Sequence, residues 1–154
     1  MSEQKDSLAG IGCGSRTRTY MKLAMEQKDR YRIAAAADPV KQRTEAVRDF
    51  APEEERDSVR LFKDAASLLA EPRLADVAII GTQDDYHYAP CRKAMELGYH
   101  VLLEKPIAKT LKEAWNCGRQ LKRRVPRAAL HPVLPHPEKI IASGEIGMPH
   151  LQRQ

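Results

Sequence analysis

Long hydrophobic runs are missing from this sequence of 154 residues. No stretch approaches the roughly 18 consecutive apolar residues that a membrane-spanning helix needs. Five polar residues follow Met1, and no basic region followed by an apolar segment comes after them, so the pattern of a secretory signal peptide is missing too. We therefore expect a cytoplasmic protein that has no membrane partner.

Cysteine is scarce, and its spacing excludes the common cysteine-based sites. The three cysteines are Cys13, Cys91 and Cys117, which lie far apart and form no Cys-x-x-Cys pair with a matching histidine spacing. Such a pattern provides neither a zinc site nor the disulfide framework of a small secreted domain. We expect reduced thiols that pack as small buried hydrophobic side chains, and no metal ion.

Aromatic residues make up only 5% of the chain, and few of them lie near its basic end. From Lys105 onwards ten Lys and Arg stand against three acidic residues, whereas the first 104 residues hold sixteen against eighteen. Such a basic end can be an electrostatic footprint for nucleic acid, but no aromatic residue is interleaved among the basic residues at 119–127. The basic end indicates a solvated helix end, and we expect no nucleic-acid partner.

What the sequence does contain is a regular alternation of apolar runs and helical segments. Strands are predicted at residues 8–11, 31–37, 59–61, 77–80 and 99–103, and helices at 15 onwards, 40–50, 64–69, 88–97 and 110–124. Strands separated by helices of this length predict right-handed crossovers. The expected fold class is α/β, with a doubly wound parallel sheet and helices on both faces.

Individual residues mark the ends of these elements. The apolar spacing of Tyr20, Leu23 and Ala24 predicts the inward face of the first helix. Asp64 and Thr110 are suited to cap helix N-termini, and Gly98 is suited to end a helix. Residues 52–57 are expected to form an acidic surface loop.

The last thirty residues break this rhythm. Four prolines fall between positions 126 and 137, which weakens a sixth strand near 128–130, and a last short helix is predicted at 137–143. We therefore divide the chain into one domain at 1–124 and an irregular proline-rich tail at 125–154.

A glycine cluster joins the first strand to the first helix. Gly10, Gly12, Gly14, Ser15 and Arg16 fall in this turn, where a bare backbone approaches a pyrophosphate whose charge the helix N-terminus stabilises. The third position of the dinucleotide fingerprint holds Thr17 in place of glycine or alanine. An ordinary strand-to-helix turn therefore stays open as the alternative.

Asp38 ends the second strand, 26 residues beyond Gly12. A carboxylate there accepts hydrogen bonds from an adenosine ribose and repels a 2′-phosphate, which predicts a Rossmann domain that binds NAD. Lys41 and Arg43 follow closely and leave NADP as the alternative cofactor. A turn aspartate before proline is the structural alternative for Asp38.

Two further segments, at residues 81–87 and 104–106, complete a pattern that resembles the Gfo/Idh/MocA oxidoreductase family. The resemblance runs from about residue 8 to residue 115, with a fainter echo at 141–147. It implies hydride transfer between a nicotinamide cofactor and a secondary alcohol of a sugar or cyclitol. No single motif is specific, but their order and spacing together are.

The resemblance also implies roles for residues on the nicotinamide side of the cleft. The implied cofactor-binding residues there are Thr82, Asp84, His87, Glu104 and Lys105. Lys105 is the implied proton-transfer group and His87 shapes the site, so both are candidate catalytic residues. The structural alternatives are a helix-start histidine and a solvent-exposed turn lysine. Pro106 is implied to follow a cis bond.

Family members continue into a substrate domain that this sequence does not contain. We expect a fragment, a frameshifted gene or a divergent end, and cofactor binding without efficient turnover. The alternative is a non-catalytic NAD-binding or subunit-interaction module, whose exposed apolar surface would favour a homo-oligomer.

Overall fold

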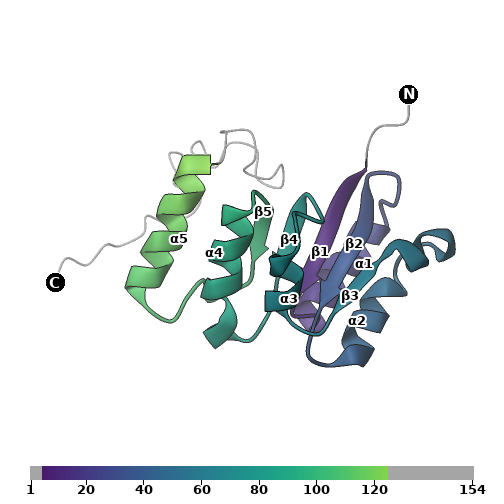
Figure 1. Ribbon diagram of the computed structural model, residues 1–154, viewed down its shortest axis with the longest axis horizontal. Coiled ribbons are helices and arrows are strands. Elements are labelled where there is room, and N and C mark those ends of the chain that lie inside the picture. Colours follow the sequence, from purple (N-terminus) through teal and green to yellow (C-terminus); the bar gives the residue numbers. More distant parts are fainter. Residues whose placement is uncertain (1–4, 125–154) are drawn as a thin grey trace, which may run out of the picture. The chain divides into compact units, whose positions relative to one another are not determined.

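The computed structural model describes residues 5–124, with side chains described up to residue 117 (Figure 1). The strands are β1 Asp6–Ile11, β2 Tyr31–Ala37, β3 Arg60–Phe62, β4 Val77–Ile80 and β5 His100–Leu103. The helices are α1 Ser15–Met25, α2 Lys41–Arg48, α3 Ala65–Ala70, α4 Tyr88–Glu96 and α5 Leu111–Arg124, with two short 3-10 helices, η1 Glu53–Ser58 and η2 Asp84–Tyr86.

The five strands form one parallel sheet in the order β3-β2-β1-β4-β5. The chain winds outward from β1 to β3 and then returns to the other side of β1 to add β4 and β5. This reversal makes the gap between β1 and β4 a topological switch point, the place where open α/β sheets bind ligands. The predicted doubly wound α/β fold is confirmed.

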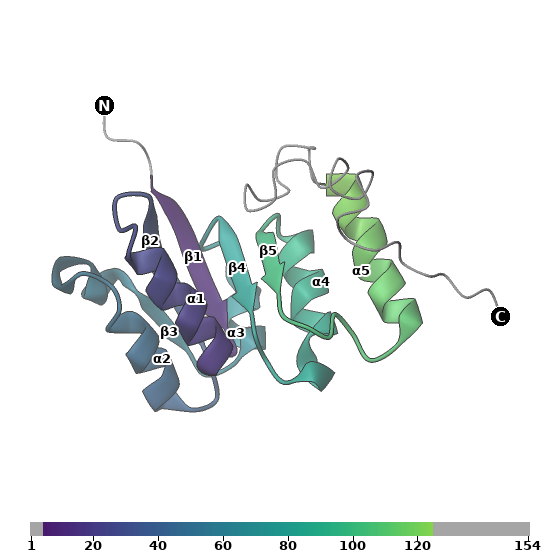
Figure 2. The same ribbon diagram turned by 180° about the vertical axis from the view of Figure 1, so that it is seen from behind.

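Helices cover both faces of the sheet, as the two opposite views show (Figures 1 and 2). On one face α1 and α2 pack through Met21 and Val47 against Leu8, Ile33 and Ile79. The alanine-rich end of β2 is buried, as its apolar run predicts for a central strand. Small alanine side chains leave room for helices to approach the sheet closely.

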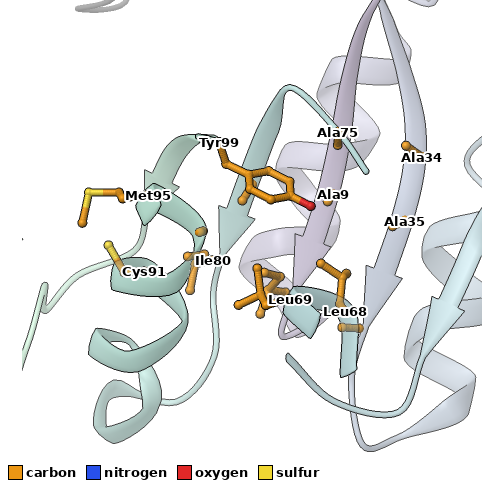
Figure 3. Packing of buried hydrophobic residues seen from close by; sticks show 14 of the residues in the cluster. Ala9, Ala34, Ala35, Leu68, Leu69, Ala75, Ile80, Cys91, Met95 and Tyr99 are labelled. Atoms are coloured by element: carbon orange, nitrogen blue, oxygen red, sulfur yellow. The ribbon is translucent and has the colours of Figure 1, made fainter. Parts of the chain in front are cut away.

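The other face is covered mainly by α3 and α4. Leu68 and Leu69 of α3, together with Cys91 and Met95 of α4, pack against a cluster that includes Ile80 of β4 (Figure 3). Burial of each leucine side chain contributes about 1.5–3 kcal/mol to the stability of the fold. Cys117 of α5 belongs to the same cluster, so all three cysteines are buried as predicted.

The predicted caps are present. Asp64 Oδ1 accepts a hydrogen bond from Ser67 N at 2.7 Å at the start of α3. At α5 the pairing is reciprocal, because Glu113 N donates to Thr110 Oγ1 while Thr110 N donates to Glu113 Oε2. Gly98 follows α4 with a φ of +87°, a conformation that favours glycine.

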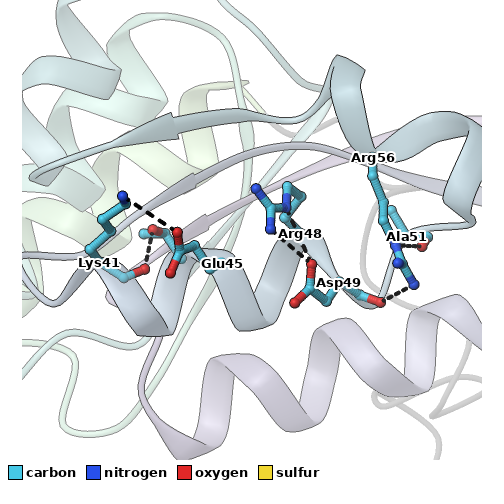
Figure 4. Close-up of polar contacts among 7 residues, drawn as sticks. Lys41, Glu45, Arg48, Asp49, Ala51 and Arg56 are labelled. Atoms are coloured by element: carbon cyan, nitrogen blue, oxygen red, sulfur yellow. Dashed lines mark hydrogen bonds and ion pairs between the residues drawn. The ribbon is translucent and has the colours of Figure 1, made fainter.

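Two local predictions were wrong. Of the three residues predicted for the inward face of α1, Tyr20 and Ala24 pack against the core as predicted, but Leu23 is 51% exposed. The fully buried residues of this helix are Thr17 and Met21. The expected loop at 52–57 is instead the 3-10 helix η1. Arg56 holds it against the end of α2 by donating to the carbonyls of Ala51 and Asp49, each at 3.1 Å (Figure 4). Those carbonyls lack partners within α2, so the arginine satisfies them.

The predicted tail lies outside the described residues, as do its weakened strand at 128–130, its helix at 137–143 and the family echo at 141–147. The domain boundary after residue 124 stays a prediction. Within residues 5–124, no helix combines the length and the apolar content needed to cross a bilayer.

Candidate functional site

Four strand ends are aligned at one edge of the sheet. Ile11 of β1 is in register with Ala37 of β2 and Ile80 of β4, and Ile80 is in register with Leu103 of β5. Backbone hydrogen bonds continue the alignment one residue further, from Gly12 N, Gly81 N and Glu104 N to the neighbouring strand ends at 2.8, 2.9 and 3.0 Å. The loops that carry the predicted site residues therefore start side by side.

Gly12 makes the sharp turn out of β1. Its φ is +75°, and a Cβ on it would lie 2.6 Å from both N and Cα of Thr82. Glycine is therefore required at this position both by conformation and by the close approach of the neighbouring loop. Gly10, inside β1, lies next to the side chains of Met21 and Thr17 of α1. Its lack of a side chain therefore lets α1 pack closely on the strand.

Gly14 begins α1 and leaves open space beside the first turn. A Cβ at Gly14 would meet only Gly81 O, at 3.9 Å, and no side chain among the described residues caps the helix. The amide groups at Ser15 and Arg16 are then free to bind an anion with the favourable end of the helix dipole.

Thr17 takes the position of the third fingerprint glycine and is fully buried. A Cβ on Gly81 would overlap the Thr17 hydroxyl, so the absence of a side chain at Gly81 makes room for the threonine. The bare backbone of Gly81 at the end of β4 thus lets α1 approach the sheet closely although its first turn holds a threonine.

Asp38 is only 4% exposed and is held by backbone groups of the described chain. Its Oδ2 accepts from Cys13 N and its Oδ1 from Val40 N, both at 2.8 Å. The carboxylate therefore fastens the glycine loop to the end of β2. Arg43 Nη1 lies 3.8 Å from Asp38 Oδ2, on a side chain that is half exposed.

A pocket of about 510 Å³ opens at the switch point. Its lining residues are Arg16, Gly81, Thr82, Asp84, His87, Glu104, Lys105 and Pro106. All five residues predicted on the nicotinamide side thus surround one cavity, joined by Arg16 from the glycine loop. Gly10, Gly12, Gly14, Ser15 and Asp38 do not line it, although the loop they shape leads into it.

His87 is 1% exposed, and both ring nitrogens face carbonyl oxygens. Nδ1 lies 2.6 Å from Pro106 O and Nε2 lies 3.0 Å from Thr82 O. The Lys105-Pro106 bond is cis, as the family resemblance implied. His87 thus links the loop after β4 to the turn after β5.

Glu104 has a partner that the sequence did not reveal. The Tyr20 hydroxyl on α1 donates a short hydrogen bond to Glu104 Oε1, and Lys105 N donates to Oε2 at 3.2 Å. The bond from Tyr20 lowers the pKa of Glu104 and raises the pKa of Tyr20. Tyr20 and Glu104 are 84 positions apart, so only the fold brings them together.

These features fit a dinucleotide. The open side of Gly14 and the uncapped start of α1 suit a pyrophosphate. Within the described part of the chain, Thr82 Oγ1 is buried on the pocket-lining loop without a hydrogen-bond partner. Among residues 5–124, no three His, Cys, Asp or Glu side chains are grouped to hold a metal ion.

Comparisons with known proteins agree with this geometry. Residues 8–128 match the Gfo/Idh/MocA family, described as an oxidoreductase family with an NAD-binding Rossmann fold. An oxidoreductase from Agrobacterium radiobacter, solved with NAD+, L-tartaric acid and magnesium, is 27% identical with a TM-score of 0.61, and the match covers 79% of this chain and 33% of that one.

Two further solved structures show the same fold. A myo-inositol dehydrogenase from Lactobacillus casei, solved with NAD(H) and myo-inositol, is 24% identical with a TM-score of 0.65, over 78% of this chain and 34% of that one. A WlbA dehydrogenase from Chromobacterium violaceum, solved with NADH and UDP-GlcNAcA, is 22% identical with a TM-score of 0.66, over 80% and 34%. The chain thus spans about a third of the length of these relatives.

Proposed function

Because this chain belongs to the Gfo/Idh/MocA oxidoreductase family, we propose that residues 5–124 bind a nicotinamide dinucleotide for hydride transfer to or from a secondary alcohol of a sugar or cyclitol. The observation that carries the proposal is the pocket at the β1–β4 switch point, whose lining joins Arg16 of the glycine loop to Glu104 and Lys105. Solved relatives bound to NAD(H) support the choice of cofactor class.

The glycine loop would hold the phosphates. Backbone amides at Ser15 and Arg16 would donate to the pyrophosphate, and the Arg16 guanidinium would add charge-assisted bonds at the pocket side. Gly14 would let the phosphates approach the backbone, while Gly10 and Gly12 keep the loop in shape.

Asp38 and Arg43 would meet the adenosine ribose. We propose NAD as the cofactor, with NADP as the alternative that the nearby guanidinium of Arg43 supports. Both carboxylate oxygens of Asp38 already accept backbone hydrogen bonds, so its repulsion of a 2′-phosphate is weaker than that of a free carboxylate.

The nicotinamide end would lie beside Thr82, Asp84, His87, Glu104 and Lys105. A bound nicotinamide supplies the hydride acceptor or donor. Lys105 would take up or release the proton of the alcohol through its Nζ, and His87 would shape the site around it. The buried and unpartnered hydroxyl of Thr82 would donate to the cofactor.

Calorimetric titration with NAD and NADP tests the proposal directly. Loss of binding in Asp38→Ala, beside retained binding in Lys105→Ala, would separate the adenosine end from the proton-transfer end. Failure of the wild-type chain to bind either nucleotide would refute the proposed function. A sugar dehydrogenase rate typical of the full-length relatives would refute our expectation that this chain turns over inefficiently.

A second candidate function is a subunit-interaction module. Leu111 and Trp115, one turn apart on α5, are 87% and 67% exposed, and Ile107 just before the helix is 48% exposed. Exposed apolar side chains of this size favour association. We expect self-association in light scattering, and a clean monomer at high concentration would count against this second candidate.

A further inference from the structure

We propose that Tyr20 and His87 are positioning residues that hold the turn at residues 104–106 from two sides, so that Lys105 meets the nicotinamide end of the cofactor in one orientation. This inference rests on the proposed function, because the orientation matters only if a nucleotide occupies the pocket. It also gives His87 a role other than direct proton transfer.

The first side of the turn is fastened to α1. Tyr20 donates its hydroxyl to Glu104 Oε1, and the second oxygen of the same carboxylate accepts the backbone N–H of Lys105 at 3.2 Å. The carboxylate therefore bridges a rigid helix and the backbone of the lysine itself. Removal of the tyrosine hydroxyl would leave Glu104 free to rotate away from the turn.

Electrostatics favours this bridge in its ionised form. The hydrogen bond from Tyr20 is the main reason that the pKa of Glu104 is lowered, and Arg16 and Lys105 act in the same direction. The pKa of Tyr20 is raised by the same bond, so the phenol keeps its proton. A charged acceptor and a neutral hydroxyl donor make a strong hydrogen bond.

The second side of the turn is fastened to the start of α4. His87 precedes that helix, its Nδ1 lies 2.6 Å from Pro106 O, and its Nε2 lies 3.0 Å from Thr82 O. A carbonyl oxygen only accepts, so each of these contacts is a hydrogen bond when the ring nitrogen that makes it carries the proton. A buried ring engaged at both nitrogens has no free atom for a substrate, which is why we assign His87 to positioning.

Between these two fixed points, Lys105 itself is exposed at the pocket. Its backbone is held on one side through Glu104 and on the other through Pro106, whereas the side chain reaches the cavity. This arrangement suits a group that must meet a reacting atom at a defined place, because misplacement by about 1 Å can cost on the order of 100-fold in rate.

The first experiment measures the turn without nucleotide. Tyr20→Phe removes only the hydroxyl, and Tyr86→Phe, at a side chain that is 66% exposed, is the matched control. We expect the 15N order parameter of the Lys105 amide to fall from about 0.85 to below about 0.6 in Tyr20→Phe and to stay unchanged in the control. An unchanged value in Tyr20→Phe would overturn the inference.

His87 is tested with two variants that each keep one donor. Asn places an amide nitrogen near the position of Nδ1, and Gln places one near Nε2. We expect His87→Asn to keep the order parameter of Lys105 closer to wild type than His87→Gln, because only Asn retains the bond to Pro106 O. The reverse order would overturn the role of His87; if neither variant folds, Tyr20→Phe still decides.

The second experiment compares NADH with ADP-ribose, which lacks the nicotinamide. In Tyr20→Phe we expect NADH to bind at least fivefold more weakly and ADP-ribose to bind within twofold of wild type. An equal loss for both ligands would indicate general damage and overturn the inference. If wild type binds neither ligand, the proposed function fails, and the order parameters alone decide whether the two residues hold the turn.

Discussion

Gly81 and Thr17 fit together because the glycine has no side chain. The hydroxyl of Thr17 fills the space in which a Cβ of residue 81 would stand, and Thr17 is fully buried. Within the described residues this hydroxyl has no hydrogen-bond partner, so its place is set by packing alone. The pair replaces the glycine that the dinucleotide fingerprint normally has on the helix.

A double-mutant cycle tests this replacement. Gly81→Ala should lower the free energy of unfolding by about 1–3 kcal/mol, because the added methyl overlaps the threonine hydroxyl. In Thr17→Ala/Gly81→Ala the next contacts of the new Cβ are Thr17 N at 3.6 Å and Gly12 O at 3.7 Å, which are ordinary distances. Urea unfolding should therefore show that Thr17→Ala restores most of the loss, and additive effects would contradict the pairing.

Gly12 and Gly14 should respond differently to alanine. Gly12→Ala places a Cβ 2.6 Å from the Thr82 backbone at a φ of +75°, so we expect a clear fall in melting temperature and loss of NADH binding. The new Cβ in Gly14→Ala meets only Gly81 O, at an ordinary contact distance of 3.9 Å. The melting temperature should therefore stay within about 2 °C of wild type while NADH affinity falls, since a methyl would occupy phosphate space. Equal stability losses would contradict this distinction.

Much of this fold was predictable from local pattern. The alternation of apolar runs with helical segments gave the order of elements, and the bounds predicted for β2 and β4 match the observed strands. Asp64 and Gly98 were predictable as caps because each acts within a few residues of its own position. Alignment of parallel strand ends then gathers the residues that follow them, as Gly81 and Glu104 illustrate.

Contacts between distant residues were not predictable. Nothing near Tyr20 in the sequence indicates that its hydroxyl reaches Glu104. Leu23 was assigned to the inward face of α1 because it is apolar, whereas Leu23 is exposed and the polar Thr17 is buried. Asp38 illustrates a second limit. The carboxylate after β2 was expected to be available to bind a ribose, whereas in the folded chain both of its oxygens already accept hydrogen bonds from backbone amides.

Asp76 makes stability depend on acid pH. Its pKa is lowered, chiefly by hydrogen bonds from Ser7, whose Oγ lies 2.6 Å from Asp76 Oδ2. Because the folded pKa is below the value of about 3.9 in unfolded chains, the stabilisation is complete above about pH 4 and is lost as pH falls through the folded pKa.

We therefore expect Asp76→Asn to lower the free energy of unfolding at pH 7 by about 1 kcal/mol, a value discounted because the side chain is 36% exposed. The difference from wild type should shrink below about pH 4. Asp57→Asn, at an exposed position of η1, is the charge-matched control and should have little effect. Thermal unfolding measures the stability of wild type and Asp76→Asn at each pH. A difference between the two proteins that stays constant from pH 7 to pH 3 would contradict this role of Asp76.

Arg43 should decide how well the chain accepts a 2′-phosphate. Its guanidinium lies 3.8 Å from Asp38 Oδ2 and is half exposed, so it can turn towards a phosphate beside the ribose. Arg43→Leu should weaken NADP by about tenfold, the size of one charge-assisted hydrogen bond, and leave NAD within twofold. Arg48→Leu, at the far end of α2, is the control. Calorimetry that finds equal losses for NAD and NADP would contradict this role.

The three thiols should be inert in the folded protein. Burial raises the pKa of Cys13 and of Cys91 to about 12, and burial also raises the pKa of Cys117. Since the thiolate is the reactive form, we expect 5,5′-dithiobis(2-nitrobenzoate) at pH 8 to label less than one thiol within minutes in buffer and all three in denaturant. Cys91→Ser should reduce the number of thiols labelled in denaturant to two, without altering the rate of labelling of the folded protein. Rapid native labelling that Cys13→Ser abolishes would show instead that the glycine loop opens to solvent.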